Sequence, residues 1–154
     1  MNNQVQAELK KIFNGRFSTS ESTRANYARG EDTYDPVLSK AVVFPETNEE
    51  VSKILSLCNE HKIPVVPFGT GTSLEGNVVG NDKGITISLE KMNKILSVNA
   101  EDFDCRVQAC VTKEQLTEYL REDGRFFPID PGANDAIGGM ASTSASGTMA
   151  VKYG

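Results

Sequence analysis

The residues that build metal sites and disulfide frameworks are scarce in this sequence. It has one histidine, His61, and three cysteines, Cys58, Cys105 and Cys110. An odd cysteine count without a framework spacing argues against a secreted, disulfide-rich domain, so we interpret the cysteines as reduced thiols of a cytosolic protein. We expect each to be a small buried hydrophobe. The Cys105–Cys110 spacing does not fit zinc, and His61 has no matching ligand nearby, so we predict no metal site.

Excess positive charge and long apolar runs are also lacking. The 16 Lys and Arg are scattered among 21 Asp and Glu, and the net charge is −5. Affinity for a polyanion comes mainly from Lys and Arg, so we predict no nucleic-acid partner. No run approaches the roughly 20 apolar residues of a membrane span, and the N-terminus "MNNQVQAELKKIF" lacks the apolar core of a signal peptide. We therefore expect a soluble, cytoplasmic protein.

The sequence has an ordinary globular composition, with 38% hydrophobic and 24% charged residues among 154. Strand-like and helix-like stretches alternate, which predicts an α+β fold, in one domain or two small lobes. The apolar runs that predict strands lie at residues 41–44, 63–68, 84–89, 95–99 and 104–109. The first two flank a helical stretch, which favours a parallel strand–helix–strand crossover.

Three stretches have a helical pattern. Thr47 with Glu50 and Thr112 with Gln115 form capping boxes, which predict helix starts at these positions. In the second of these helices we expect Leu116, Tyr119 and Leu120 to form the buried stripe, and Gly124 to end the helix. The N-terminal stretch places Val5, Leu9 and Ile12 on one face of a third helix. His61 follows the first helix, where a histidine at the C-terminal end is favoured by the helix dipole.

A glycine-rich loop, "PFGTGTSLEG" at residues 67–76, directly follows a predicted strand. Its glycines allow positive φ and close approach of a ligand, and successive amides can form a concave nest for phosphate oxygens. Thr70, Thr72 and Ser73 add hydroxyl groups. The loop lacks the lysine of a Walker motif, and no helix follows it as in a Rossmann motif. Taken alone, it could equally be a plain connection between strands.

A second segment, "DPGANDAIGGMASTSASG" at residues 130–147 (the small-residue segment), is rich in Gly, Ala, Ser and Thr. Gly138 and Gly139 would let the backbone pack closely against a flat ligand or against other backbone. Taken alone, the segment is better interpreted as a tight turn followed by a small-residue helix packed on a sheet. We expect Asp130 to stabilise that turn rather than to act as an acid.

Together and in this order, three stretches resemble the flavin-binding domain of the vanillyl-alcohol-oxidase/p-cresol-methylhydroxylase superfamily. They are "AVVFPETNEEVSKILSLCNEHKIPVVPFGTGTSLEG", "VNAEDFDCRVQACVT" and "FPIDPGANDAIGGMASTSASGTMAVKYG". The closer similarity is to its D-2-hydroxy-acid dehydrogenase branch, of the D-lactate dehydrogenase and glycolate oxidase type. The resemblance implies an FAD-binding domain over residues 34–154, incomplete at its C-terminal end. Residues 1–33 are then an N-terminal helical extension with no assigned role.

In this superfamily the first loop wraps the FAD pyrophosphate, and the second segment lies along the flavin and the pyrophosphate. The resemblance therefore implies the following cofactor-binding residues: Phe68, Gly69, Thr70, Gly71, Thr72, Ser73, Leu74, Asp130, Pro131, Gly132, Ala133, Asn134, Asp135, Ala136, Gly138, Gly139, Thr143, Ser144, Ala145 and Ser146. Some members attach flavin to a histidine of the first loop. This loop has none, which implies non-covalent FAD.

The resemblance further implies oxidation of a small 2-hydroxy acid by hydride transfer to flavin N5, with a quinone or cytochrome as electron acceptor. The full-length form would be cytoplasmic or peripheral to a membrane. In the family the catalytic histidines and the substrate-binding arginine lie beyond the matched part, so we expect no catalytic residue here and no activity of this chain alone. Two alternatives remain: a catalytically silent flavin-domain fragment that self-associates into a homo-oligomer, and a nucleotide-binding domain unrelated to flavin.

Overall fold

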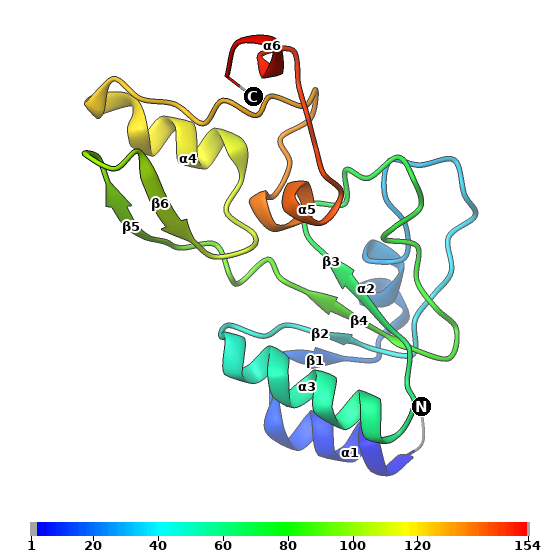
Figure 1. Ribbon diagram of the computed structural model, residues 1–154. Helices are drawn as coiled ribbons and strands as arrows, with labels where there is room; N and C mark the ends of the chain where they lie inside the picture. The colour runs from blue at the N-terminus through cyan, green and yellow to red at the C-terminus, as the bar shows by residue number, and fades with distance from the viewer. Residues whose placement is uncertain (1–2, 154) are drawn as a thin grey trace. The chain divides into compact units, whose positions relative to one another are not determined.

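The computed structural model describes residues 3–153, which divide between Lys91 and Met92 into two compact units (Figure 1). We call them unit 1 and unit 2. None of the helices within the described residues is long and apolar enough to cross a membrane.

Unit 1 is built on a four-stranded sheet. Its strands are β1 (Phe17–Ser18), β2 (Val42–Val43), β4 (Ile85–Ser88) and β3 (Val65–Phe68), in that order across the sheet. β1 is antiparallel to β2, whereas β2, β4 and β3 are parallel. The three parallel strands confirm the strands predicted over 41–44, 63–68 and 84–89. The parallel crossover is also confirmed, but β4 lies between the two strands that it connects.

Two helices, α1 (Asn3–Ile12) and α3 (Asn48–Glu60), pack on one face of this sheet (Figure 1). Their buried side chains form one apolar cluster with Ala41, Val43 and the β4 residues Ile85 and Ile87. The helices contribute Val5, Leu9, Ile54 and Cys58, and Phe13 joins them from the turn directly after α1. The hydrophobic effect of this burial is the main force that holds the N-terminal helix in place. A short third helix, α2 (Glu21–Asn26), follows β1 and is capped by the Ser20 side chain.

The buried face of α1 differs in one residue from the prediction. Val5 and Leu9 are fully buried as expected, but Ile12 is 44% exposed and Phe13 is buried in its place. Phe13 follows Leu9 by four residues and so lies on the same side of the helix. The proposed division into a 1–33 extension and a 34–154 domain stays a prediction. Within unit 1, however, the residues of that extension share the core of the sheet.

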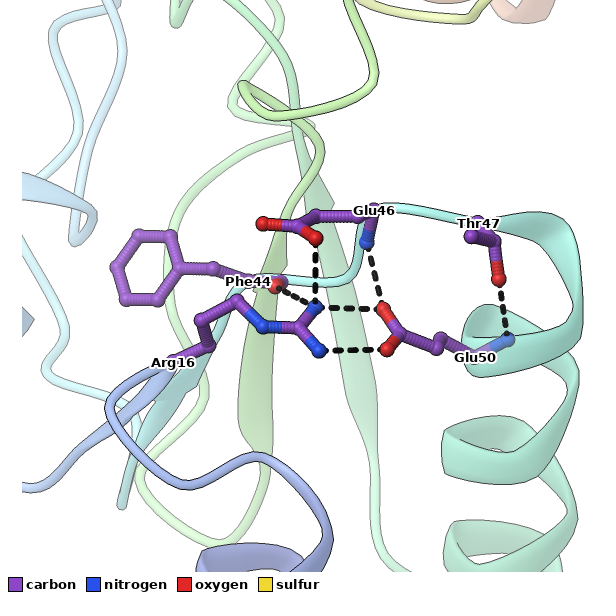
Figure 2. Close-up of polar contacts among 5 residues, drawn as sticks. All are labelled: Arg16, Phe44, Glu46, Thr47 and Glu50. Carbon is purple, nitrogen blue, oxygen red and sulfur yellow. Dashed lines mark hydrogen bonds and ion pairs between the residues drawn. The ribbon is translucent and has the colours of Figure 1, made fainter.

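The turn after α1 is tied to the start of α3 by a polar cluster around Arg16 (Figure 2). The Arg16 guanidinium donates two hydrogen bonds of 2.6 Å to the Glu50 carboxylate and one of 3.1 Å to the Phe44 carbonyl. Glu50 also accepts from the Glu46 amide at 2.7 Å, and its own amide donates to Thr47 Oγ1, which confirms the predicted cap. The hydrogen bonds from Arg16 chiefly hold the pKa of Glu50 down, at about 2.

We expect Glu50→Gln to lower the free energy of unfolding by about 1–2 kcal/mol at pH 7, because it removes the charge that pairs with Arg16. The loss is modest because solvent screens a partly exposed ion pair. A carboxylate whose pKa is depressed in the folded state contributes stability above its unfolded value, near 4.5, and loses it as the pH falls toward about 2. Urea unfolding at several pH values should therefore show the wild type and variant converging over this range. Glu8→Gln is the control, because Glu8 is exposed. It should change the free energy of unfolding by less than about 0.5 kcal/mol at every pH value tested. A difference between wild type and Glu50→Gln that is independent of pH would contradict this assignment.

Unit 2 is a hairpin packed against one main helix. The hairpin strands β5 (Ile95–Asn99) and β6 (Asp104–Val107) confirm the strands predicted over 95–99 and 104–109, and the structure shows that they pair antiparallel. The helix α4 (Lys113–Leu120) begins at the predicted cap, since Thr112 Oγ1 accepts from the Gln115 amide. A 3₁₀ turn, η1 (Arg121–Asp123), continues it to Gly124, whose φ of +67° confirms the predicted stop. Two short helices follow, α5 (Ile137–Ser142) and α6 (Ala150–Tyr153).

Two expectations about burial in unit 2 are wrong. Leu116 and Leu120 are buried with Val111, but Tyr119 is 60% exposed. Successive helix residues point about 100° apart, so the residue beside Leu120 falls at the edge of a narrow stripe. Cys58 and Cys110 are buried as expected, whereas Cys105 is exposed on β6. Partial desolvation and then the Asp104 carboxylate raise the pKa of the Cys105 thiol, which keeps it protonated at neutral pH.

Candidate functional site

The glycine-rich loop leaves the sheet at the end of β3. Phe68 is the last residue of β3, and its side chain is buried. Gly71 has a φ of +77°, and a Cβ added there would lie 2.8 Å from Cζ of the Phe68 ring. Both the backbone angle and the close ring favour glycine at position 71. The loop therefore turns back tightly over the residue from which it started.

The backbone of this loop carries unused hydrogen-bond donors. Within residues 3–153, no protein acceptor receives a hydrogen bond from the amides of Gly69, Thr70, Gly71, Ser73 and Leu74. Consecutive amides of this kind can act as a nest for an anion, and the glycine with positive φ is typical of one. The loop fits a phosphate group in this respect, and its donors are neutral, since it contains no Lys or Arg.

Hydroxyl groups line the same loop. Thr70 Oγ1 and Thr72 Oγ1 lie 3.2 Å apart. Ser73 Oγ accepts from Asn77 Nδ2 at 3.0 Å and from the Glu75 amide at 3.4 Å. An oxygen that accepts two hydrogen bonds still has its own proton to donate, so Ser73 can serve as a donor to a ligand. Leu74 is 69% exposed and offers only its backbone as a polar group.

The first part of the small-residue segment, residues 130–136, holds the start of α4. Lys113 Nζ lies 2.7 Å from Asp130 Oδ1 and donates to the Pro131 carbonyl at 3.0 Å. Asn134 Oδ1 accepts from the Glu114 amide at 3.1 Å, and the Asp135 carbonyl accepts from the Lys113 amide. These polar groups therefore satisfy amides that a helix start leaves open. Asp130 has a structural partner, Lys113, which the sequence pattern did not reveal.

The second part of the segment forms α5 and its end. Ala136 precedes the helix, and Gly138 packs on Ala109, where an added Cβ would lie 2.8 Å from the Ala109 carbonyl oxygen. This confirms the expected close approach at Gly138, to backbone of the same chain. Around Gly139, by contrast, no atom of the described residues lies within 4 Å of an added Cβ.

After α5 the chain reverses with a non-glycine residue in the left-handed region. Ser144 has a φ of +53°, and the Ala145 amide donates to the Met140 carbonyl, which is the bond pattern of a Schellman motif. Thr143 Oγ1 donates back to the Gly139 carbonyl at 3.0 Å. Ser142, Thr143, Ser144 and Ser146 are all exposed. The hydroxyls of Ser142 and Thr143 donate to the Gly138 and Gly139 carbonyls, so those of Ser144 and Ser146 are the better candidates for donors to a ligand.

Gly147 brings the two parts of the small-residue segment together. A Cβ at this position would lie 2.2 Å from the Asp130 carbonyl oxygen, so the chain at 147 runs directly along the backbone at 130. The predicted residues 130–136 and 143–146 are thus gathered within unit 2. The predicted residues 68–74 are gathered within unit 1.

Comparison with known proteins connects this geometry to a cofactor. A protein-family model described as an FAD-binding domain matches residues 39–154. The chain belongs to this family of FAD-binding domains. Solved structures support the same fold. An alkyldihydroxyacetonephosphate synthase covers 100% of the chain with a TM-score of 0.90 at 21% identity. A p-cresol methylhydroxylase covers 82% with a TM-score of 0.67 at 23% identity. The predicted α+β fold of the vanillyl-alcohol-oxidase/p-cresol-methylhydroxylase type is therefore confirmed.

Several curated relatives of this FAD-binding domain are named as hydroxy-acid enzymes. A probable mitochondrial D-lactate dehydrogenase of Danio rerio is 44% identical over 137 residues, which are 89% of this chain and 28% of that protein. A mitochondrial D-lactate dehydrogenase (cytochrome) of Arabidopsis thaliana is 39% identical over 150 residues, 96% of this chain and 26% of that protein. The glycolate oxidase subunit GlcD of Bacillus subtilis is 31% identical over 140 residues, 90% of this chain and 30% of that protein. The chain thus spans less than a third of the length of these relatives.

These matches confirm the predicted resemblance and FAD as the cofactor of the family. The match supports an FAD-binding role for the domain as a whole, while the individual contact residues stay predictions. Two of the relatives are named as mitochondrial, which does not support the expected cytoplasmic location.

Proposed function

We propose that this FAD-binding domain serves a flavin-dependent oxidoreductase that oxidises a small 2-hydroxy acid of the D-lactate or glycolate type. The observation that carries the proposal is the loop after β3, with five amides that have no acceptor among the described residues, inside a matched FAD-binding domain. The names of the relatives support the substrate class.

In this proposal the glycine-rich loop binds the pyrophosphate. Its amides and the hydroxyls of Thr70, Thr72 and Ser73 would share the phosphate charge among neutral donors, which an amide nest can do without lysine. The Phe68 ring packs against the turn at Gly71. No histidine lies in residues 67–76, so the proposal includes non-covalent attachment.

The small-residue segment would lie along the flavin and the pyrophosphate. Its polar groups divide into two sets. Asp130, Asn134 and Asp135 are already used to hold the start of α4 and would act by shaping the segment. Gly132, Gly139, Ser144 and Ser146 are exposed and are the residues of the segment best placed to contact a ligand.

Bound FAD would accept a hydride at N5 from the α-carbon of the hydroxy acid. The part of this chain is to bind and orient the cofactor; the base and the substrate-binding residues would lie outside residues 3–153. We further propose a quinone or cytochrome as electron acceptor, in line with the word cytochrome in the name of one relative, and assembly into a homo-oligomer. The same proposal includes a full-length protein that is cytoplasmic or peripheral to a membrane.

The test is a titration of the purified chain with FAD, followed by flavin fluorescence and by the visible spectrum after desalting. We expect the wild type to retain FAD and Gly71→Ala to bind it at least about tenfold more weakly, because a left-handed alanine costs about 1–2 kcal/mol and displaces the Phe68 ring. Gly124→Ala is the matched control: its φ is also positive, but no described atom lies within 4 Å of the added Cβ.

Three other outcomes would count against the proposal. AMP or ADP binding as tightly as FAD would indicate a nucleotide site unrelated to flavin. A colourless chain whose mass in solution rises with concentration would favour the silent, self-associating module. Equal FAD affinities for the wild type and Gly71→Ala would remove the glycine-rich loop from the site.

A further inference from the structure

We propose that residues 27–34 are a positioning segment for the glycine-rich loop, and that FAD affinity depends on them although they precede the matched FAD-binding domain at residues 39–154. The proposal rests on the proposed function of that loop. The segment contacts the loop and its continuation at four successive places, through Tyr27, Ala28, the Gly30–Glu31 pair and Tyr34.

The central contact fixes one peptide plane of the loop. The Glu31 amide donates a hydrogen bond of 3.0 Å to the Gly71 carbonyl. The carbonyl of Gly71 and the N–H of Thr72 belong to the same planar trans peptide and point in opposite directions. Holding the carbonyl toward Glu31 therefore directs the Thr72 N–H away from the positioning segment.

Gly30 packs closely against the same Gly71 carbonyl and against one further carbonyl, that of Ser73. A Cβ added at Gly30 would lie 2.7 Å from the Gly71 carbonyl oxygen and 2.8 Å from that of Ser73. The Ser73 carbonyl shares its peptide plane with the Leu74 amide, one of the donors without an acceptor. Only a residue without a side chain permits this approach, so position 30 controls the orientation of two loop peptides.

The conformation of the positioning segment is itself fixed locally. Asp32 accepts hydrogen bonds from the Gly30 amide at 3.2 Å and from the Tyr34 amide at 3.0 Å. The bond from the Tyr34 amide, two residues further on, forms the turn that aspartate favours, and the bond from Gly30 ties the preceding backbone to the same carboxylate. The Tyr34 ring then packs on Gly76, where an added Cβ would lie 2.7 Å from ring atoms.

Tyr27 supports the loop from the opposite end, through an aromatic cluster. Its ring packs edge-on against two others, with ring centroids 5.1 Å apart for Phe68 and 5.5 Å apart for Phe44. Its hydroxyl donates a hydrogen bond to the Glu90 carboxylate. The Phe68 ring is the one that Gly71 turns over. The neighbouring Ala28 carbonyl accepts from the Gly80 amide at 3.0 Å.

These contacts matter because residues 69–84 contain no helix or strand of their own. A connection of this length is costly to order when a ligand binds. Contacts that order it beforehand raise affinity without touching the ligand. The positioning segment thus supplies order, whereas the loop supplies the donors.

The test compares Gly30→Ala with the wild-type chain in two measurements: FAD affinity by flavin fluorescence, and hydrogen exchange without FAD of the Glu31 and Gly80 amides, which donate to the Gly71 and Ala28 carbonyls. We expect Gly30→Ala to weaken FAD binding about tenfold and to speed the exchange of these amides. Gly15→Ala is the control: position 15 has a positive φ, unlike position 30, but no described atom lies within 4 Å of the added Cβ, so any strain stays local to residue 15. It should leave both measurements unchanged.

Tyr27→Leu is a second, milder variant that does not touch the loop backbone. It should also weaken FAD binding and speed exchange. Tyr27→Phe keeps the ring contacts and should preserve FAD affinity. The proposal would be overturned if Gly30→Ala and Tyr27→Leu both matched the wild type in exchange rate and in FAD affinity. If the wild-type chain takes up no FAD, the proposed function fails. The exchange comparison then decides alone whether residues 27–34 order the loop.

Discussion

Replacing Phe13 with alanine should lower the free energy of unfolding of the chain by about 3–5 kcal/mol. Phe13 is fully buried between α1, α3 and the sheet, in one cluster with Leu9 and Ile54. Its removal leaves a cavity that a close-packed core cannot fill. A loss of this size is a large part of the total stability of a small domain. Urea unfolding followed by circular dichroism measures it.

Ile12→Ala is the matched control for this prediction, since it truncates the neighbouring residue, the last one of α1. Ile12 is 44% exposed, so we expect a loss of less than about 1 kcal/mol. Equal losses for the two variants would mean that α1 contributes through helix formation alone. A small loss for both would indicate that residues 3–13 can be removed without harm to the sheet.

The second large effect is expected at Leu116 in unit 2. Leu116→Ala should destabilise α4 and the hairpin by about 2–5 kcal/mol. Leu116 is fully buried in a small cluster, whose buried members among the described residues are Val111, Leu116 and Leu120. With so few buried side chains, each carries a large share of the apolar area that holds the helix on the hairpin. Hydrogen exchange of the α4 amides measures the loss directly.

Tyr119→Ala is the control on the same helix. Tyr119 is 60% exposed, and its truncation should change the exchange of α4 amides little. A larger loss of protection in Tyr119→Ala than in Leu116→Ala would restore the buried stripe that the sequence pattern predicted, and would contradict the packing described for unit 2.

Local sequence signals predicted the helix starts and the strands well. The caps at Thr47 and Thr112 depend on residues three positions apart, and such short-range bonds can be recognised in a sequence. The order of strands in the sheet could not be predicted in this way. The insertion of β4 between β2 and β3 depends on pairing between segments far apart in the chain. The burial of Phe13 in place of Ile12 depends on the same sheet, because the position of the sheet decides which side of α1 is covered.

For the candidate site, the sequence predicted the segments but not their supports. The glycine-rich loop could be located from its composition, but alone it could equally be a plain connection between strands, and its role was predicted only from its resemblance together with the small-residue segment. The contact of Lys113 with Asp130 joins residues 17 positions apart, and that of Glu31 with Gly71 joins segments separated by a helix and two strands. No periodic pattern marks such pairs. The supports of a binding loop therefore emerge only from the folded chain.

The order of the sheet in unit 1 has a consequence for contact between molecules. β3 is an outer strand, and outer strands can recruit a strand of another chain and begin aggregation. The amides of Ile85 and Leu89 donate to the carbonyls of Pro64 and Phe68, so alternate residues of β3 are directed at β4 and Pro67 is directed away from it. Proline has no N–H to offer an incoming strand. Pro67 thus blocks pairing along this edge without loss of any bond inside the sheet.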